Sequence, residues 1–81
     1  MDKSIHTAQY KVLIDLLRKE REQKKITQEQ LAGRLSVQQA VISKIETCER
    51  RIDFIEMRQI CIALGISPLD FVNKFELILQ K

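Results

Sequence analysis

The stretch ITQEQLAGRLSVQQAVISKIE, residues 26–46, carries the signals for two short helices joined by a tight turn. Thr27 has the side chain of an N-cap, and Gln30, three residues later, completes a capping box. We therefore expect one helix over residues 27–35. A second helix is expected over residues 39–47, after a short connection.

The apolar residues of this stretch are spaced so that the two helices can bury them against each other. They recur three or four positions apart, which is the spacing of one helical face. Ala32 is small where the helices would cross, as a steep crossing with a short connection requires. The apolar residues expected in this contact are Leu31, Leu35, Val37, Ile42 and Ile45.

The second helix also has a polar surface that would pack a core poorly. Its side chains are small or carry amides, and only one of them is charged. Such a surface is either ordinary solvated protein or a binding surface that matches hydrogen-bonding groups. The residues concerned are Gln38, Gln39, Ala40, Val41, Ser43 and Lys44.

The rest of the chain predicts three further helices and no strand. One is expected over residues 7–24, with positive charge at its C-terminal end, where the helix dipole favours it. Another follows Asp53 as N-cap. The last begins at Ser67 as N-cap and covers about residues 67–80. The predicted fold class is all-α, with five helices in a single domain of residues 1–81.

Composition and charge narrow the class of protein. Residues 1–51 hold eleven Lys and Arg against seven Asp and Glu, whereas residues 52–81 hold three against four. A surface for a polyanion is therefore expected in the first two thirds of the chain. No apolar run approaches the roughly 18 residues of a membrane span, and the charged N-terminus is unlike a signal peptide. We expect a cytoplasmic protein with no membrane contact.

No pattern of residues predicts catalysis, a metal site or a cofactor. The sequence has no Ser/His/Asp set and no glycine-rich phosphate loop, and His6 stands alone near the terminus. Cys61 falls at helical spacing among apolar residues, which predicts a core thiol. Cys48 could be an exposed redox sensor or form an intermolecular disulfide, but without a visible partner we favour neither role. We expect neither an enzyme nor a small-molecule substrate.

The central stretch resembles the lambda repressor/Cro-like helix-turn-helix proteins, also called the xenobiotic-response-element (XRE) type. The flanking segments LRKERE and ALGISPLDFV extend the resemblance to about residues 17–72, which is most of the chain. The match is specific because many positions fall at the family's spacing together. They are Gln28, Leu31, Ala32, Val37, Ile42, Ile45 and Glu46.

The resemblance implies that the helix over residues 39–47 is a recognition helix lying in the major groove of double-stranded DNA. By position, Gln39, Ala40 and Lys44 match the main base-contacting sites of the family, with Gln38, Val41 and Ser43 beside them. These side chains suit bases, because an amide can pair with adenine, an amine with guanine, and a methyl group with thymine.

The resemblance also implies that Gln28 contacts a phosphate. Arg50 and Arg51 lie in the turn after the recognition helix, where cations can approach the DNA backbone. Lys24 and Arg34 are broader phosphate-contacting candidates; ordinary solvation is the alternative for all of these cations.

Arg21 and Glu46 match an Arg–Glu pair of similar repressors, which implies a structural role in orienting the recognition helix. Three residues depart from the family pattern. Ser36 and Cys48 stand where many relatives have Gly, and Gln38 replaces the usual Ser or Thr N-cap. Because a left-handed backbone is strained at a residue with a Cβ atom, we expect the turn at Cys48 to have another conformation.

The last helix has more apolar residues than one core-facing stripe needs. The surplus either folds back over the first helix or forms a homodimer, and we favour the homodimer. The expected interface residues are Phe71, Val72, Phe75, Ile78 and Leu79.

These features together predict a sequence-specific transcriptional regulator, most simply a repressor that binds a palindromic operator as a homodimer. No cofactor is expected. The alternative is a protein-interaction module, such as an antitoxin-type partner of another protein, with weak or no DNA binding.

Overall fold

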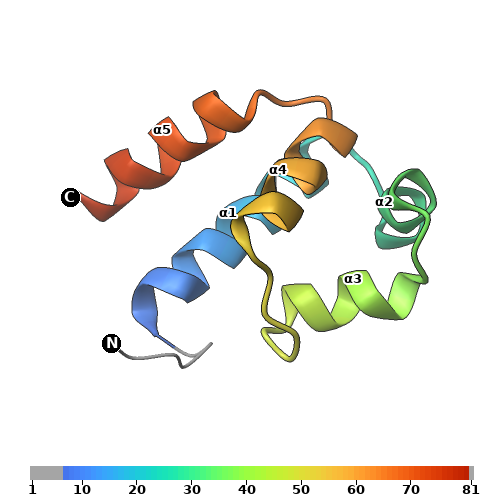
Figure 1. The fold of residues 1–81 in the computed structure, drawn as a ribbon. Coiled ribbons are helices and arrows are strands. Elements are labelled where there is room, and N and C mark those ends of the chain that lie inside the picture. The colour runs from blue at the N-terminus through green and yellow to red at the C-terminus, as the bar shows by residue number, and fades with distance from the viewer. Residues whose placement is uncertain (1–6, 81) are drawn as a thin grey trace.

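The computed structural model describes residues 7–80, which form five helices and contain no strand. The helices are α1 (Ala8–Gln23), α2 (Gln28–Leu35), α3 (Gln39–Glu46), α4 (Phe54–Ala63) and α5 (Pro68–Leu79), as Figure 1 shows. This confirms the all-α fold class, and the helix ends agree with expectation to within one or two residues. His6 lies outside the described residues.

Side-chain caps start four of the helices. The hydroxyl of Thr7 accepts a hydrogen bond from the Tyr10 backbone N–H at the start of α1, and the Ser67 hydroxyl accepts from Asp70 at the start of α5. At α2 and α4 both hydrogen bonds of a capping box are present, from Thr27 and Asp53. The Gln38 side chain, by contrast, caps none of the described N–H groups of α3.

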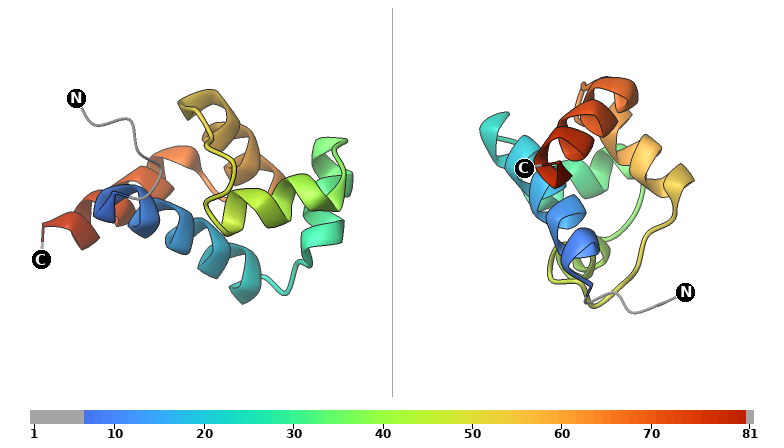
Figure 2. Two further views of the ribbon diagram at one scale, coloured as in Figure 1. Left: turned by 90° about the horizontal axis from the view of Figure 1, so that it is seen from below. Right: turned by 90° about the vertical axis from the view of Figure 1, so that its left-hand side faces the viewer.

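The helices enclose one apolar core. α2 packs on α3 and α4, α1 packs on α3 and α5, and α4 packs on α5. Figure 1 places α3 at the lower edge of the molecule and α5 at the upper left, and Figure 2 shows the same separation from two other sides. The buried apolar residues are Tyr10, Ile14, Leu17, Ile26, Leu31, Ala32, Ile42, Ile45, Cys48, Ile52, Met57, Ile60, Cys61, Leu64 and Phe71.

Within residues 7–80, three turns use left-handed backbone at residues other than glycine, and Lys25, between α1 and α2, has φ 58°. Ser36, between α2 and α3, has φ 57°, and Cys48, after α3, has φ 62°. The expectation of another conformation at Cys48 was wrong. The backbone N–H groups of Glu49 and Arg50 both donate to the carbonyl oxygen of Lys44, at 2.8 and 3.0 Å, and the Cys48 side chain is buried. These contacts offset the strain.

Helix α5 lies back on α1 and α4 with part of its apolar surface. Phe71 was expected in the dimer interface. Its side chain is only 1% exposed, so it belongs to the core, and that expectation was wrong. Val72, Phe75 and Leu79 are half-buried. The inward side of α5 accounts for these residues because α5 packs on two helices at once. Leu69, Leu77 and Ile78 stay exposed.

An ion pair also attaches α5 to α1. The Nζ of Lys74 lies 2.7 Å from Oε1 of Glu20, whose side chain is buried. The hydrogen bond to this carboxylate raises the pKa of Lys74. Within residues 7–80, no helix has the length and apolar character that crossing a membrane requires.

Candidate nucleic-acid interface

Helix α3 presents a polar face outward while its apolar face enters the core. Ile42 and Ile45 are buried, and they fix α3 against α1 and α2. The candidate base-contacting residues divide into two sets on this helix. Val41 and Ser43 are half-buried, whereas Gln38, Gln39, Ala40 and Lys44 are exposed. Four of the six candidates are therefore accessible to solvent.

A chain of hydrogen bonds joins α1, α3 and α2 beside this surface. The Arg21 guanidinium donates from Nε to Oε2 of Glu46 at 2.7 Å and from Nη2 to Oε1 at 3.0 Å. Oε1 of Glu46 also accepts from Nε2 of Gln28, at 2.9 Å. The next amide follows: Nε2 of Gln39 donates to Oε1 of Gln28, at 3.0 Å. We call these four side chains, Arg21, Glu46, Gln28 and Gln39, the polar relay.

The inner end of the polar relay is shielded from solvent. The side chains of Arg21 and Glu46 are 11% and 8% exposed, and Nη1 of Arg21 donates to the backbone oxygen of Ile26 at 2.8 Å. The hydrogen bond with Glu46 raises the pKa of Arg21. A two-pronged pair of this kind sets the angle between the groups it joins. It ties the end of α1 to the end of α3.

Comparison with known proteins identifies this arrangement. A family model described as "Helix-turn-helix" matches residues 17–71, more than half of the chain. The chain belongs to the XRE-type helix-turn-helix family. A solved structure, described as an XRE-family like protein from Pseudomonas syringae pv. tomato str. DC3000, is 42% identical. The two structures match over 94% of this chain and 93% of the Pseudomonas chain, with a TM-score of 0.85. A search of curated proteins finds no match.

The XRE-type family is one of DNA-binding regulators and not of enzymes. In this helix-turn-helix protein, α2 and α3 are the two helices of the motif, with Ser36 to Gln38 between them. In such motifs the second helix enters the major groove of DNA and the first crosses the backbone. Gln28 and Gln39 each stand at the first position of their helix.

The arginines expected at phosphates all have partners within this XRE-type protein. Arg50 pairs with Glu56 at 2.8 Å, and the Arg50 guanidinium lowers the pKa of the Glu56 carboxyl. Arg51 lies over the ring of Tyr10, 5.1 Å from its centroid. Nη1 of Arg34 donates to the carbonyl oxygen of Ala63 at 2.8 Å, at the C-terminal end of α4. Among the expected phosphate contacts, Lys24 is exposed and Gln28 is half-buried in the polar relay.

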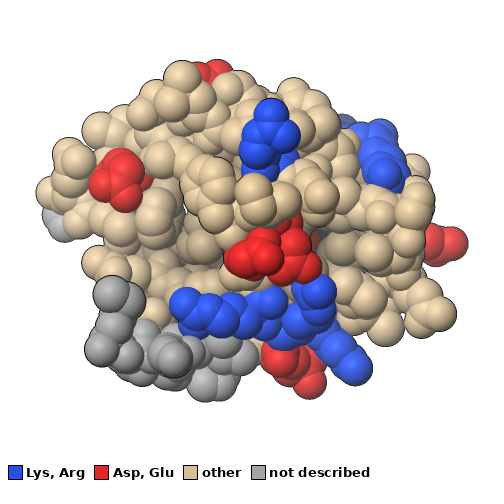
Figure 3. All heavy atoms as spheres, in the orientation of Figure 1, with Lys and Arg blue, Asp and Glu red and all other residues tan. Residues whose placement is uncertain are grey.

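Charged side chains of both signs lie near the end of α3 (Figure 3). Figure 3 shows Lys and Arg side chains along the lower part of this face, beside the segment that joins α3 to α4. The area over α4 and α5 has few charged side chains in the same view.

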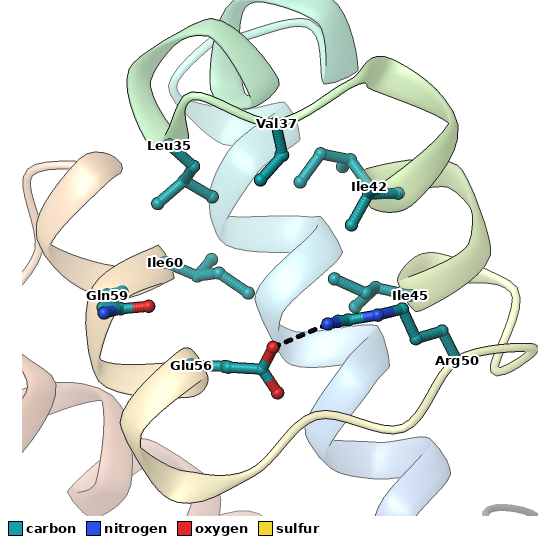
Figure 4. Close-up of a pocket in the computed structure, with 9 residues that line it drawn as sticks. Leu35, Val37, Ile42, Ile45, Arg50, Glu56, Gln59 and Ile60 are labelled. Carbon is teal, nitrogen blue, oxygen red and sulfur yellow. Dashed lines mark hydrogen bonds and ion pairs between the residues drawn. The ribbon is translucent and has the colours of Figure 1, made fainter.

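A small apolar hollow lies between α2, α3 and α4, as Figure 4 shows. Its volume is about 80 Å³, and the Arg50–Glu56 ion pair spans its mouth. Val37, expected in the contact between the two helices, points into this hollow and is 40% exposed. The hollow thus separates the turn of the motif from α4. The apolar residues lining it are Leu35, Val37, Val41, Ile42, Ile45 and Ile60.

Several positioning contacts had no signal in the sequence. The Tyr10 hydroxyl accepts a hydrogen bond from the backbone N–H of Ile52 at 3.0 Å and so holds the segment after α3. The bonds from Gln28 to Glu46 and from Arg34 to Ala63 also join residues far apart in the chain. Only the spacing of the family motif marked Gln28 as a functional residue. The role that this spacing implied was a phosphate contact, not a hydrogen bond to Glu46.

The sulfur groups lie inside the protein. Cys61 is fully buried, its thiol lies 3.6 Å from the sulfur of Met57, and burial raises its pKa to about 11. Cys48 is buried as well. In the part of the chain that the structure describes, no group of three or more His, Cys, Asp or Glu side chains could hold a metal ion.

Proposed function

We propose that this protein is a sequence-specific transcriptional regulator that represses by binding a palindromic operator as a homodimer. The observation that carries the proposal is the exposed face of α3, where Gln39 is held at the outer end of the polar relay. An amide held in place loses less freedom on binding a base edge than a free one does. Occupation of a promoter by the protein would then block transcription. We place this action in the cytoplasm, on nucleoid DNA.

The chemistry of the exposed α3 residues supports direct readout of bases. A glutamine can form two hydrogen bonds with adenine, and a lysine can reach O6 and N7 of guanine. Gln39 and Lys44 are both exposed on α3 and supply these two groups. Ala40, also exposed, offers a methyl contact to thymine. Gln38 adds a second amide at the start of the helix, and Val41 and Ser43 stay secondary candidates because they are half-buried.

Phosphate contacts would supply affinity without sequence preference. Gln28 and Lys24 are candidates near the start of α2. Arg50 and Arg51 are candidates near the end of α3, and Arg34 is a candidate on α2. A phosphate at Arg50 would compete with its ion pair to Glu56, so that contact is expected to be weak.

Dimerisation would use the uncovered part of α5. Leu77 and Ile78 are 61% and 40% exposed, and Phe75 and Leu79, on the inward side of the same helix, are half-buried. Exposed side chains of this size favour a contact with another apolar surface. A two-fold symmetric pair would place two α3 helices on one side of a duplex, about 34 Å apart, which matches one turn of DNA.

Selection of bound duplexes from a random pool tests the DNA-binding proposal. We expect the protein to enrich a palindromic sequence, and the double variant Gln39→Ala/Lys44→Ala to lose at least about tenfold in affinity for it while staying folded. The control Arg58→Ala/Gln59→Ala also removes one cation and one amide, but from the exposed side of α4. It should bind like the wild type. Equal loss in both variants would contradict readout by α3.

Sedimentation equilibrium tests the dimer. Leu77→Glu should convert a dimer to a folded monomer, because the side chain is exposed in the single chain and its burial would occur only between copies. Ile62→Glu is the matched control, since Ile62 is 53% exposed on α4. A wild-type protein that stays monomeric at micromolar concentration would overturn this part of the proposal.

A protein-interaction module of the antitoxin type is the second candidate. The observation that favours it is the outer side of α4, where Ile55 and Ile62 are exposed in addition to the apolar residues of α5. One symmetric contact through α5 would leave these two residues uncovered. Absence of duplex binding above background at low salt would favour this second function.

A further inference from the structure

The hydrogen bonds of the polar relay all run in one direction, and Glu46 sets that direction. A carboxylate only accepts hydrogen bonds, whereas a glutamine amide has a donor end and an acceptor end. Because Oε1 of Glu46 faces Gln28, the Gln28 amide must turn its nitrogen toward Glu46. Its oxygen then faces outward and accepts from the nitrogen of Gln39.

The same constraint passes to the surface. Gln39 uses one N–H of its amide on Gln28, so its other N–H and its oxygen are left for a ligand. Without an accept-only group at the inner end, the relay could also run in reverse, with the oxygen of Gln39 accepting from Gln28. A chain of neutral amides alone would not choose between these two directions. The ionised carboxylate of Glu46, the partner of Arg21, fixes one direction because it can only accept hydrogen bonds.

We propose that Glu46 is a positioning residue for base recognition, which sets through Gln28 the side of the Gln39 amide that is donor and the side that is acceptor. This inference rests on the proposed function. Glu46 itself is 8% exposed and would act only through the two glutamines. Its bond to Arg21 supplies a second, structural role that the experiment must separate.

The direction of the amide determines which base edge it fits. Gln28 lies on the helix that crosses the DNA backbone in this motif, so the nitrogen end of Gln39 is the end nearer that backbone. Adenine presents an N7 acceptor nearer its own backbone and an N6 donor nearer the groove centre. This pattern matches a Gln39 amide whose nitrogen faces the backbone and whose oxygen faces the groove centre. Guanine presents two acceptors and matches one end only. Glu46 thereby favours adenine opposite Gln39.

Base preference at one operator position tests the inference. Duplexes would carry either A·T or G·C at the position where Gln39→Ala changes the preference. The wild type should prefer adenine there by at least about fivefold. Glu46→Gln removes the accept-only group, and Gln28→Met interrupts the relay while leaving the Arg21–Glu46 pair in place. Both variants should bring the preference to within about twofold. The preference opposite Lys44 should not change, whereas a purely structural role would weaken all positions together.

Two further measurements complete the test. Gln59→Met, the matched control on α4, should keep the wild-type preference. In the free protein, the side-chain amide protons of Gln39 should show a hydrogen bond by NMR that disappears in Gln28→Met. This second readout needs no DNA and remains available if Glu46→Gln fails to fold.

The outcomes separate the inference from the proposed function. A wild-type protein that enriches no sequence would overturn both. Enrichment of an operator, with the adenine preference retained in folded Gln28→Met and Glu46→Gln, would overturn the inference alone. An NMR spectrum without a hydrogen bond at Gln39 in the wild type would also overturn it.

Discussion

The α2–α3 pair and helix α5 are attached to the rest of the molecule by different kinds of contact. The pair buries apolar residues from both helices, Leu31 and Ala32 from α2 and Ile42 and Ile45 from α3, and adds the polar relay. Of the twelve residues of α5, only Phe71 is fully buried, and the Lys74–Glu20 ion pair is its main polar attachment.

This difference reflects what each region has to do. Hydrogen bonds depend strongly on angle and distance, so a relay of them holds side chains in one geometry. Apolar contact has little directional preference and depends on the area covered. A surface that distinguishes bases needs the first kind of contact, whereas a surface that joins two copies works with the second. The predictions below test this contrast, beginning with the largest expected effect.

Phe71→Ala should be the most destabilising single change in α5. The side chain is 1% exposed, and truncating a buried Phe typically costs about 4 kcal/mol in the free energy of unfolding. Urea denaturation followed by circular dichroism measures it. Leu69→Ala, in the same helix but 70% exposed, should change the stability by no more than about 0.5 kcal/mol. A similar small change for both variants would mean that α5 is not anchored by Phe71.

Arg21→Met should be the most disruptive polar change in the α2–α3 region. It leaves the Glu46 carboxylate shielded and without its guanidinium, at a cost of about 3 kcal/mol. Arg18→Met is the control, because the Arg18–Asp15 pair is exposed and worth only about 0.5 kcal/mol. Equal effects in chemical denaturation would remove the distinction between the shielded pair and a surface pair.

The Cys61 thiol should be protected from alkylation in the folded protein. The degree of protection reports on the core that both regions share. Burial raises its pKa from 9.0 to about 11, so the contribution of this thiol to stability is complete below pH 9 and is lost between pH 9 and 11. At pH 8.5 the thiolate fraction is about a hundredfold lower than in the unfolded chain. Mass spectrometry after iodoacetamide treatment, with and without urea, checks this.

The same labelling distinguishes the two regions. Because Cys61 lies on α4, which packs on α5, loosening α5 should expose this thiol. Cys61 should therefore react faster in Phe71→Ala than in an Arg21→Met variant compared at equal overall stability. Equal rates would indicate that the two regions open together.

Gly33→Ala should have the smallest effect and the opposite sign. Gly33 is exposed on α2, and a Cβ atom there would meet no heavy atom within 4 Å among the described residues. The helix should gain about 1 kcal/mol of stability. Gly65→Ala is the contrasting control: its φ of +75° is unfavourable for a side chain, so it should destabilise. Thermal denaturation measures both, and destabilisation by Gly33→Ala would contradict the open surface at α2.

Much of the fold could be predicted because its signals are local. Thr27, Asp53 and Ser67 cap the helices that were expected to begin there. The errors arose where a local rule met a distant contact. A left-handed Cys48 is unfavourable by itself, but its buried side chain and the turn's hydrogen bonds to Lys44 outweigh that cost. Phe71 shared an apolar pattern with its neighbours, and the pattern alone did not distinguish inward from outward residues.

The candidate site shows the same division between local and distant information. Family spacing indicated Arg21 and Glu46 as a structural pair and Gln28 and Gln39 as DNA contacts, but it did not link the pair to the two glutamines. Their roles at DNA stay predictions, as do those of the remaining α3 residues. Neither the contact of Arg34 with Ala63 nor the Arg50–Glu56 pair could be predicted, because no sequence pattern links these residues.

The sequence by itself determined the five helices, their order and the family, because capping residues, apolar spacing and motif spacing act over a few positions of the chain. The tertiary structure alone decided that Gln28 lies between Glu46 and Gln39, that Phe71 faces inward, and that Leu77 faces outward. These outcomes depend on how helices from distant parts of the chain meet. Packing brings their side chains together only when the whole core forms.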